Sequence, residues 1–527
     1  MTPYRSAPSS TEQGWPKGIS YIVGNEGCER FSYYGMSAIL YVYIIALQGS
    51  GDYATSVVHL FISGVYAFPL IGAVIADRLL GKYHTILWFS LVYCLGHLVL
   101  SLTEGSMSGL YFGLSLIALG AGGIKPCVSA HVGDQFGKSN WRLIPKVYQV
   151  FYFIINFGSF FATLLIPVIR SYFGWSVAFA IPGVLMFVAT GVFWMGRNKF
   201  VHVPPQPGGH LGLLDATSSI FLFASVGSLA FTASLSTPIA IAVSMACLMI
   251  GLVLFQVRQS KVRDDGFLAV SLAAISDWFR RLFLRISQWG LLFSATSSSG
   301  GSQGHGAPKP RSTLRDQFST EAIDGASAIV RILSIFLFVS IFWALFDQHG
   351  SSWIRQAKMM NLNVLGFELM PSQIQGINPI LVMILIPLMS YMFGHIKPLL
   401  RMSVGMIIAS FSFVVVALIQ AQLDQGAQLN VVWQLLPYIL ITVAEVLVSV
   451  TGLEFAYTQA PKRMKSTVMG FWLLSVAFGN ILVAFTARFA GLPLVDFFWV
   501  FAGLMAIAAG LFALRARYYV PQDYPQH

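Results

Sequence analysis

The chain has 527 residues, of which 56% are hydrophobic and only 10% are charged, and its mean hydropathy is +0.70. Water-soluble proteins carry about 25% charged residues, so this composition excludes a soluble globular fold. The net charge of +11 does not indicate nucleic-acid binding, because the basic residues lie in connectors between apolar runs rather than on one amphipathic face.

Apolar runs long enough to cross a bilayer as helices recur along the whole chain. Polar, Gly and Pro breaks predict six of them near residues 21–47, 55–79, 84–103, 108–127, 146–169 and 175–196. Two more follow PPQPGG, near 212–234 and 238–258. Another six end the chain, near 326–348, 372–394, 400–422, 431–458, 466–490 and 493–515. The sequence predicts an all-α polytopic membrane protein with fourteen transmembrane helices.

These spans predict two six-helix bundles, over residues 1–200 and 326–527, with an inserted helix pair over 201–260 and a linker over 261–325. In the linker, FLAVSLAAISDWFRRLFLRISQWGLLF is expected to form a helix along the membrane surface, and SATSSSGGSQGHGAPKPRS a flexible stretch. DRLLGKYH and FGHIKPLLR follow the second span of each bundle and form a faint repeat. Two facing repeats are typical of alternating-access transporters, whose substrate site lies at the midplane.

Lys and Arg fix the expected orientation. If the N-terminus is cytoplasmic, the outer connectors carry only Arg170, Arg355, Lys358 and Arg488, and the positive-inside rule places both termini in the cytoplasm. The N-terminal segment lacks the apolar core of a signal peptide, so the first span is expected to insert uncleaved.

Neither a metal site nor an enzyme is predicted. The four cysteines, Cys28, Cys94, Cys127 and Cys247, have no CxxC or Cys/His spacing and are expected to be buried free thiols. The sequence has no HExxH motif and no P-loop, and its one GxSxG match, GGSQG at 300–304, lies in a Ser/Gly-rich stretch and not in a nucleophile elbow.

The first span carries a stripe of polar and aromatic residues. A charge at mid-bilayer costs at least about 2.5 kcal/mol, so such residues normally face a cavity or a partner. Glu26, Glu29, Arg30, Tyr33 and Tyr34 fall on one helical face. An internal salt bridge that only orders the helix is the alternative to a functional role.

Other spans of the first bundle add polar groups. His59 and Tyr66 are two turns apart on span 2, where a His that merely packs is the alternative. Lys125 lies in span 4 and either faces inward or extends to the interface. In span 5, Asn156 follows Tyr152 by one turn.

In the second bundle, Asp347 closes the apolar run IFLFVSIFWALF, and Glu445 lies inside LPYILITVAEVLVSVTG, where a functional role is favoured. Asn378 precedes Pro379, so a structural role at a kink is as good an interpretation as ligand binding.

Together these groups match a zwitterion that contains a peptide bond. Arg30 and Lys125 offer cations for a carboxylate, and Glu445 offers an anion for an ammonium group. Asn156 and Asn378 offer amides for backbone groups. The aromatic side chains available for the ligand's side chains are Tyr33, Tyr34, Tyr66, Trp343 and Trp472.

Several segments resemble motifs of the proton-dependent oligopeptide transporters of the major facilitator superfamily. EGCERFSYYG resembles ExxERFxYYG, while GAGGIKPCVSAHVGDQF and FYFIINFGSF resemble the signatures around spans 4 and 5. PLIGAVIADRLLGK resembles the facilitator loop between spans 2 and 3, and the inserted pair is typical of bacterial members. The resemblance implies a major facilitator fold and a monomer in the bacterial inner membrane. It also implies a transporter that needs no cofactor and is driven by the proton gradient.

The same resemblance implies roles for individual residues. Arg30, Lys125 and Tyr34 would bind the peptide carboxylate, and Lys125 with Glu445 would also bridge the bundles near the cytoplasmic gate. The residues implied at the amino end of the peptide are Glu445, Asn156 and Asn378. Those implied in proton coupling are Glu26, Glu29, His59, Asp347 and Glu445. Asp77 and Arg78 would serve the conformational switch, although a helix cap explains Asp77 equally well.

FWALFDQHGSSW and the placement of His59 resemble the animal members, in which the span-2 histidine pairs with the aspartate that corresponds to Asp347. Where many members have an arginine, this chain has Ser37, so an Arg-to-acid bridge between spans 1 and 7 is missing. We expect His59 and Asp347 to replace it as the extracellular gate.

The sequence therefore predicts a proton-coupled symporter that imports di- and tripeptides, with partners limited to peptides, protons and the lipid bilayer. A symporter of the same fold for nitrate or another small metabolite is the first alternative, and Lys125 with Glu445 argues against it because they supply both poles of a zwitterion. A peptide receptor that does not transport is the second.

Overall fold

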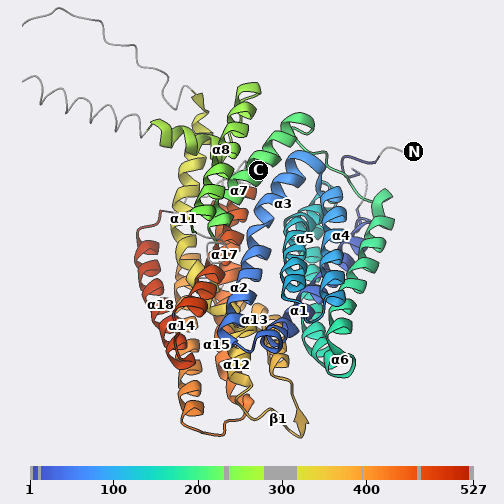
Figure 1. Ribbon diagram of the computed structural model, residues 1–527. Helices are drawn as coiled ribbons and strands as arrows, with labels where there is room; N and C mark the ends of the chain where they lie inside the picture. The colour runs from blue at the N-terminus through green and yellow to red at the C-terminus, as the bar shows by residue number, and fades with distance from the viewer. Residues whose placement is uncertain are drawn as a thin grey trace, which may run out of the picture.

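The computed structural model describes residues 4–9, 13–230, 237–277, 317–393, 396–459 and 465–520, and the statements below concern these residues. They form two groups of long helices that lie side by side, with a further helix pair against them (Figure 1). Thirteen helical runs are long and apolar enough to cross a membrane. The predicted fold class, a polytopic all-α membrane protein, is confirmed.

The first bundle begins with α1 (Ile19–Gln48) and α2 (Gly51–Ala67). Ser50 caps α2, because its side chain accepts a hydrogen bond from the Tyr53 backbone amide. Beyond α2 the second span continues through α3 (Pro69–Ile75) and a π-helical turn (Ala76–Leu80). The remaining helices of this bundle are α4 (Lys82–Leu102), α5 (Met107–Asp134) and α6 (Ile144–Met195).

α6 contains two spans rather than one. Its backbone breaks at Gly174, where φ is 81° and ψ is −178°, a conformation that L side chains rarely adopt. The break lies between the two predicted spans, 146–169 and 175–196. Dividing this run at Gly174 accounts for the fourteen predicted spans.

The inserted pair is α7 (Gly209–Ala230) and α8 (Thr237–Lys261), which lie beside α3 in Figure 1. A short apolar helix, Phe267–Asp277, follows α8. The predicted surface helix is described only as far as Asp277, and the rest of it, with the flexible stretch, lies outside the described residues.

The second bundle begins with α11 (Thr320–Phe346), a 3-10 turn (Asp347–Gly350) and α12 (Ser352–Ala357). A hairpin of β1 (Asn363–Val364) and β2 (Phe367–Glu368) pairs Asn363 with Glu368. The chain continues through a 3-10 turn (Pro371–Gly376), α13 (Ile377–Phe393), α14 (Pro398–Asp424), a 3-10 turn (Val431–Gln434), α15 (Leu435–Glu445), a π-helical turn (Val446–Val450), α16 (Thr451–Gln459), α17 (Lys465–Phe489) and α18 (Leu494–Arg517).

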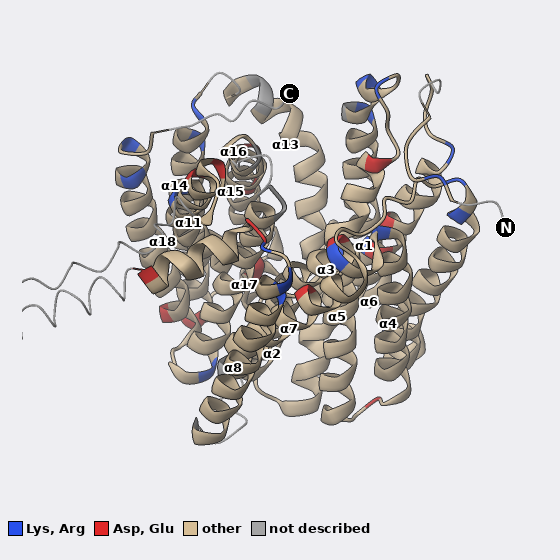
Figure 2. Cartoon of the chain, turned by 90° about the horizontal axis from the view of Figure 1, so that it is seen from above, with Lys and Arg blue, Asp and Glu red and all other residues tan. Residues whose placement is uncertain are grey.

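Each bundle has its own apolar core. Residues of α1 to α6 form one, and residues of α11 to α18 form the other. Tyr66 packs against both cores, so it lies where the bundles meet. Large apolar side chains such as Trp88, Phe187, Leu337 and Ile507 are exposed on the outside, as expected of a lipid-facing surface. In Figure 2 most of the ribbon is tan, and charged residues occupy only short stretches of it.

Candidate functional site

The polar face of α1 is buried, as its spacing predicts. We call Glu26, Glu29, Arg30, Tyr33 and Tyr34 the α1 stripe. Glu26 and Glu29 are 2% and 0% exposed. Arg30 Nε lies 2.7 Å from Glu26 Oε1 and 3.4 Å from Glu29 Oε2. An internal salt bridge, the alternative considered for this face, is therefore present between Arg30 and Glu26. The contact of Arg30 with Glu29 is the longer of the two.

Lys125 faces the interior of the bundle. Its side chain is 6% exposed, and Nζ lies 3.5 Å from Glu29 Oε1 and 4.6 Å from the centre of the Tyr33 ring. The alternative, that Lys125 extends to the interface, is therefore wrong. Packing explains the position: a Cβ added to Gly123 would lie 2.1 Å from the Phe89 ring, so only glycine lets α5 approach α4 this closely.

Glu445 anchors the polar group of the second bundle. It ends α15, and the π-helical turn that follows is a feature often found at functional sites. Asn378 Nδ2 donates to Glu445 Oε2 at 2.9 Å and to Thr442 Oγ1 at 3.1 Å. Trp343 and Trp472 are buried nearby in the same core, with their rings edge to face and 6.3 Å apart.

The two polar groups face each other across the bundle interface. Tyr34 of α1 and Tyr152 of α6 both interact electrostatically with Glu445. Asn156 donates to the carbonyl oxygen of Tyr152 at 3.0 Å, which fixes its place on the same side. The candidate substrate residues of the two bundles therefore surround one region, with cations on one side and a carboxylate on the other.

The expected bridge between Lys125 and Glu445 is not formed in this conformation. Lys125 pairs with Glu29 of its own bundle, and Glu445 accepts a hydrogen bond from Asn378 of its own bundle. Each charge is thus compensated locally, because a buried charge without a partner is costly.

A second polar group joins the bundles near the start of α2. His59 Nδ1 lies 2.6 Å from Asn480 Oδ1, and His59 Nε2 lies 2.8 Å from Ser351 Oγ. Asn480 Nδ2 donates to Asp347 Oδ2 at 2.6 Å. We call His59, Asp347, Ser351 and Asn480 the His59 cluster. His59 and Asp347 are therefore connected through an amide, rather than by the direct pairing that the resemblance implied.

The geometry of the His59 cluster assigns its hydrogens. The Asn480 amide group donates to the Asp347 carboxylate, so its oxygen is the acceptor for His59. Nδ1 of His59 must then carry hydrogen, and Nε2 of the neutral ring accepts from the Ser351 hydroxyl. A proton added at Nε2 would turn this acceptor into a donor and require Ser351 to reorient.

One ion pair closes the same end of the interface. Arg355 Nη1 lies 2.5 Å from Asp52 Oδ1, and both side chains are partly exposed. Ser37 is part of the buried interior, with its Oγ lacking a hydrogen-bond partner among the described residues. Polar contacts between the bundles at this end thus join α2 with α12 and α17, and Gln373 with the Leu164 carbonyl of α6, rather than passing through position 37.

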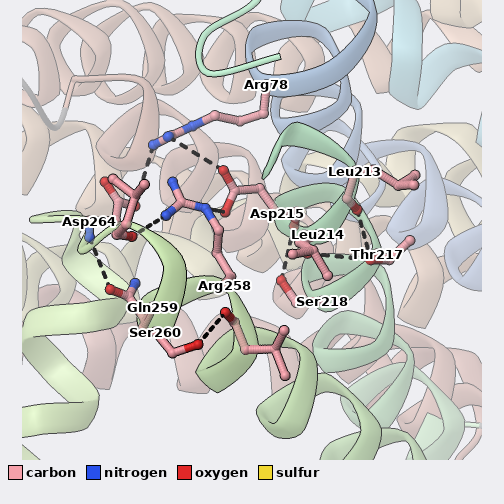
Figure 3. Close-up of polar contacts among 12 residues, drawn as sticks. Arg78, Leu213, Leu214, Asp215, Thr217, Ser218, Arg258, Gln259, Ser260 and Asp264 are labelled. Atoms are coloured by element: carbon pink, nitrogen blue, oxygen red, sulfur yellow. Dashed lines mark hydrogen bonds and ion pairs between the residues drawn. The ribbon is translucent and has the colours of Figure 1, made fainter. Parts of the chain in front are cut away.

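Arg78 lies at the opposite end of the second span, within the π-helical turn. It contacts Asp215 of α7 and Asp264 after α8, each at 3.6 Å, and Asp215 also binds Arg258 of α8 at 2.8 Å (Figure 3). We call these four residues the Arg78 cluster.

The backbone of the same turn is tied to the inserted pair. Gln206 donates its amide to the Asp77 carbonyl, and Gly208 donates to the Arg78 carbonyl. A Cβ on Gly212 would lie only 1.8 Å from the Arg78 carbonyl oxygen, so α7 contacts the turn directly. The residues expected to serve the conformational switch are thus fastened to the inserted helices.

Solved structures share this architecture. The structure of the POT family transporter PepTSo aligns with a TM-score of 0.74 and 38% identity, covering 96% of this chain and 98% of that one. Another, described as a proton dependent oligopeptide (POT) family transporter, aligns with a TM-score of 0.69 and 39% identity, covering 94% of this chain and 100% of that one. Fold and buried polar groups together define a membrane transporter of the major facilitator class.

Sequence comparison then gives the family. The profile described as POT family matches residues 83–226 and 219–496, so the chain belongs to the POT family. Rat solute carrier family 15 member 2 is 27% identical over 98% of this chain and 92% of its own length. Drosophila melanogaster peptide transporter family 1 is 32% identical over 78% of this chain, which spans about half of that protein (49%). The named relatives are transporters.

Proposed function

We propose that this protein is a proton-coupled symporter that imports di- and tripeptides by alternating access. The observation that carries the proposal is the two-pole site: Arg30 and Lys125 lie on one bundle, and Glu445 lies on the other within the electrostatic reach of Tyr34. A short peptide at neutral pH carries a carboxylate and an ammonium group, so it matches both poles at once.

Binding would exchange partners at both poles. The peptide carboxylate replaces the glutamates of the α1 stripe as the ion-pair partner of Arg30 and Lys125. Tyr34 donates a hydrogen bond from its hydroxyl to the same carboxylate. The peptide ammonium group takes Glu445, while Asn156 and Asn378 bind backbone groups next to it. Tyr33, Tyr66, Trp343 and Trp472 would contact the peptide side chains. Ligand groups that replace internal partners in this way leave few buried charges uncompensated.

Proton coupling would act at two places. Protonation of His59 at Nε2 turns this nitrogen into a donor and forces Ser351 to reorient, which loosens the contact between α2 and the start of α12 at that end of the interface. Glu26 and Glu29 take up protons when the peptide carboxylate removes their cations, since a buried unpaired carboxylate is unstable. Inward proton movement is favoured by the membrane potential by about 2.3 kcal/mol per charge per 100 mV.

The cycle fits the orientation expected from the basic residues. With both termini in the cytoplasm of a bacterial cell, the His59 cluster and the Asp52–Arg355 pair form the extracellular gate. Lys125 with Glu445 forms the cytoplasmic gate in the alternate state, and Asp77 with Arg78 serves the switch. The bundles, over 1–200 and 326–527, would act as two rigid bodies in a monomer that needs no cofactor.

Uptake by purified protein in liposomes tests the proposal. With an inward proton gradient we expect dialanine to accumulate, and N-acetyl-dialanine and dialanine amide to compete about tenfold less well, because each lacks one pole. Glu445→Gln should abolish the discrimination against the acetylated form only. Equal competition by all three compounds would contradict the two-pole site.

The same liposomes separate the alternatives. A nitrate symporter would show nitrate uptake that dialanine does not inhibit. A receptor would bind dialanine, as measured by calorimetry, without any flux across the membrane. Either result would reject peptide symport.

A further inference from the structure

Helix α4 carries polar side chains that the proposed cycle does not use. Ser90, Tyr93 and His97 follow one another at spacings of three and four residues, which place them on one helical face. All three are 0% exposed. Ser90 Oγ, Tyr93 OH and His97 Nε2 lack a hydrogen-bond partner within the described ranges. Such atoms cost about 1–3 kcal/mol each, so a row of them on one face requires an explanation.

The hydrogen-bonding state of His97 follows from its one partner. Nδ1 lies 3.2 Å from the carbonyl oxygen of Phe179, and a carbonyl oxygen can only accept. Nδ1 therefore carries hydrogen, and Nε2 of the neutral ring holds a lone pair. The ring has little freedom, because a Cβ on Gly183 of α6 would lie 2.6 Å from the Cβ of His97. His97 thus keeps a basic nitrogen in a fixed place inside the bundle.

Glu29 is a charged group whose field reaches His97. The side chains of Glu29 and His97 interact electrostatically. Their helices also meet α6 at one turn, because Ser32 of α1 donates to the Pro182 carbonyl at 2.6 Å and His97 contacts the adjacent Gly183.

The elements packed against His97 offer few other titratable groups. Glu29 acts from α1, and Asn25, one turn earlier on the same helix, has two buried amide atoms that lack a hydrogen-bond partner in the described part of the chain. α5 contributes Lys125, which contacts Glu29, and α6 contributes the Phe179 carbonyl. On α4 itself the Tyr93 ring lies 5.1 Å from His97. Ordered water would satisfy the unpartnered atoms of Asn25, Tyr93 and His97 and connect them to Glu29.

His59 and His97 differ in how many of their ring nitrogens have a hydrogen-bond partner. Both nitrogens of His59 have partners, at 2.6 and 2.8 Å, so it can bind a proton only by rearranging the His59 cluster. His97 can accept a proton at Nε2 without losing an existing hydrogen bond.

We propose that His97 is a further proton-coupling residue, whose free Nε2 accepts the proton that Glu29 takes up during peptide transport. In this step the O–H bond of the Glu29 carboxyl breaks and an N–H bond forms at His97 Nε2, through a water relay because no hydrogen bond joins the two side chains, so that a carboxylate and an imidazolium replace two neutral groups. The proton is held away from the peptide while Arg30 and Lys125 bind the peptide carboxylate. The inference rests on the proposed proton-coupled function and adds one protonation site to it.

His97→Gln tests the inference, because glutamine retains an amide donor for the Phe179 carbonyl but binds no proton near neutral pH. We expect gradient-driven accumulation of dialanine to fall about tenfold or more. Counterflow, which needs no net proton movement, should stay within about twofold of the unsubstituted protein. The pH profile of uptake should flatten as well.

His131→Gln is the matched control. His131 is also buried on α5, and its Nε2 likewise has no hydrogen-bond partner among the residues that the structure describes, but its ring packs against Phe193 and Phe200. It should leave accumulation and pH profile unchanged. A His97→Asn variant and a thermal melt of each protein separate misfolding from lost coupling.

Three outcomes overturn the inference: unchanged accumulation in folded His97→Gln, an equal loss of counterflow and accumulation in both folded His97 variants, or the same effect from His131→Gln. If the unsubstituted protein shows no gradient-driven accumulation, the proposed function itself fails instead.

Discussion

The two polar regions between the bundles differ in how their charges are compensated. At one end of the interface three links cross between the bundles, namely His59–Asn480, His59–Ser351 and Asp52–Arg355, while the Asn480–Asp347 hydrogen bond lies within the second bundle. In the candidate peptide site, Lys125 and Glu445 are each satisfied within their own bundle. The first region holds the bundles together, whereas the second leaves its charges free to exchange their partners for a ligand. The structure thus links the two bundles at one end and leaves the candidate peptide site further inside unlinked.

The largest effect is expected at the unlinked site. Glu445→Gln keeps the shape of the side chain and its contact with Asn378 but removes the anion for the peptide ammonium group. We expect the apparent affinity for dialanine to fall about a hundredfold, the cost of about 2–3 kcal/mol for losing one partner of a buried charge pair. Glu368→Gln, in the exposed hairpin, is the control. Unchanged affinity in Glu445→Gln would mean that peptides are held elsewhere.

The next effect should appear at the end where the bundles are linked. Asn480→Leu removes the amide that connects His59 with Asp347 and leaves both without that hydrogen bond. Gradient-driven uptake should fall about tenfold, since an unsatisfied buried polar group costs about 1–3 kcal/mol. Thr486→Val on the same helix is the control, because its hydroxyl bonds only within α17. Normal uptake by Asn480→Leu would show that the link through Asn480 is not part of coupling.

The Arg78 cluster gives a smaller effect, on stability rather than transport. Arg258 is buried. Its ion pair with Asp215 is shorter than the ion pair of Arg78 with the same carboxylate. Arg258→Met should lower the free energy of unfolding by about 1–3 kcal/mol, because Asp215 keeps Arg78 as a partner. Thermal melts in detergent measure this, with Arg263→Met, on the exposed side of the same segment, as the control. Identical melting of both variants would argue that the inserted pair is held by apolar packing alone.

The smallest effect is expected for the partly exposed gate pair. A double-mutant cycle with Asp52→Ala and Arg355→Ala should give a coupling energy of about 0.2–1 kcal/mol in melting experiments. Exchanging the two charges, Asp52→Arg with Arg355→Asp, should restore transport better than either single change. A coupling energy of zero would mean that this ion pair adds nothing to the closure of that end.

Periodicity and composition predicted much of this molecule. The spans, the break near 174 and the buried face of α1 follow from apolar length and three-and-four spacing, which depend on local geometry. The position of Lys125 in a glycine-rich helix was also predicted, but not its pairing with Glu29. A helix's sequence shows which residues share a face, yet not which helix that face meets.

Contacts between segments that are far apart in the chain could not be predicted from the sequence. Asn480 lies in the apolar run FGNILVAF, where a lone amide was an available signal for a buried polar contact. Asp52 and Arg355 lie in the end turns of α2 and α12, where charged residues are common and carry no such signal. Their partners depend on helix rotation and on the relative positions of the two bundles.

The central claim is that peptide and proton cross together. Its most direct test is to record dialanine uptake and internal acidification in the same proteoliposomes under an inside-negative potential without a starting pH gradient. The account predicts that dialanine accumulates and that the interior acidifies only when dialanine is present outside. Accumulation without acidification, or acidification that does not depend on the peptide, would contradict it.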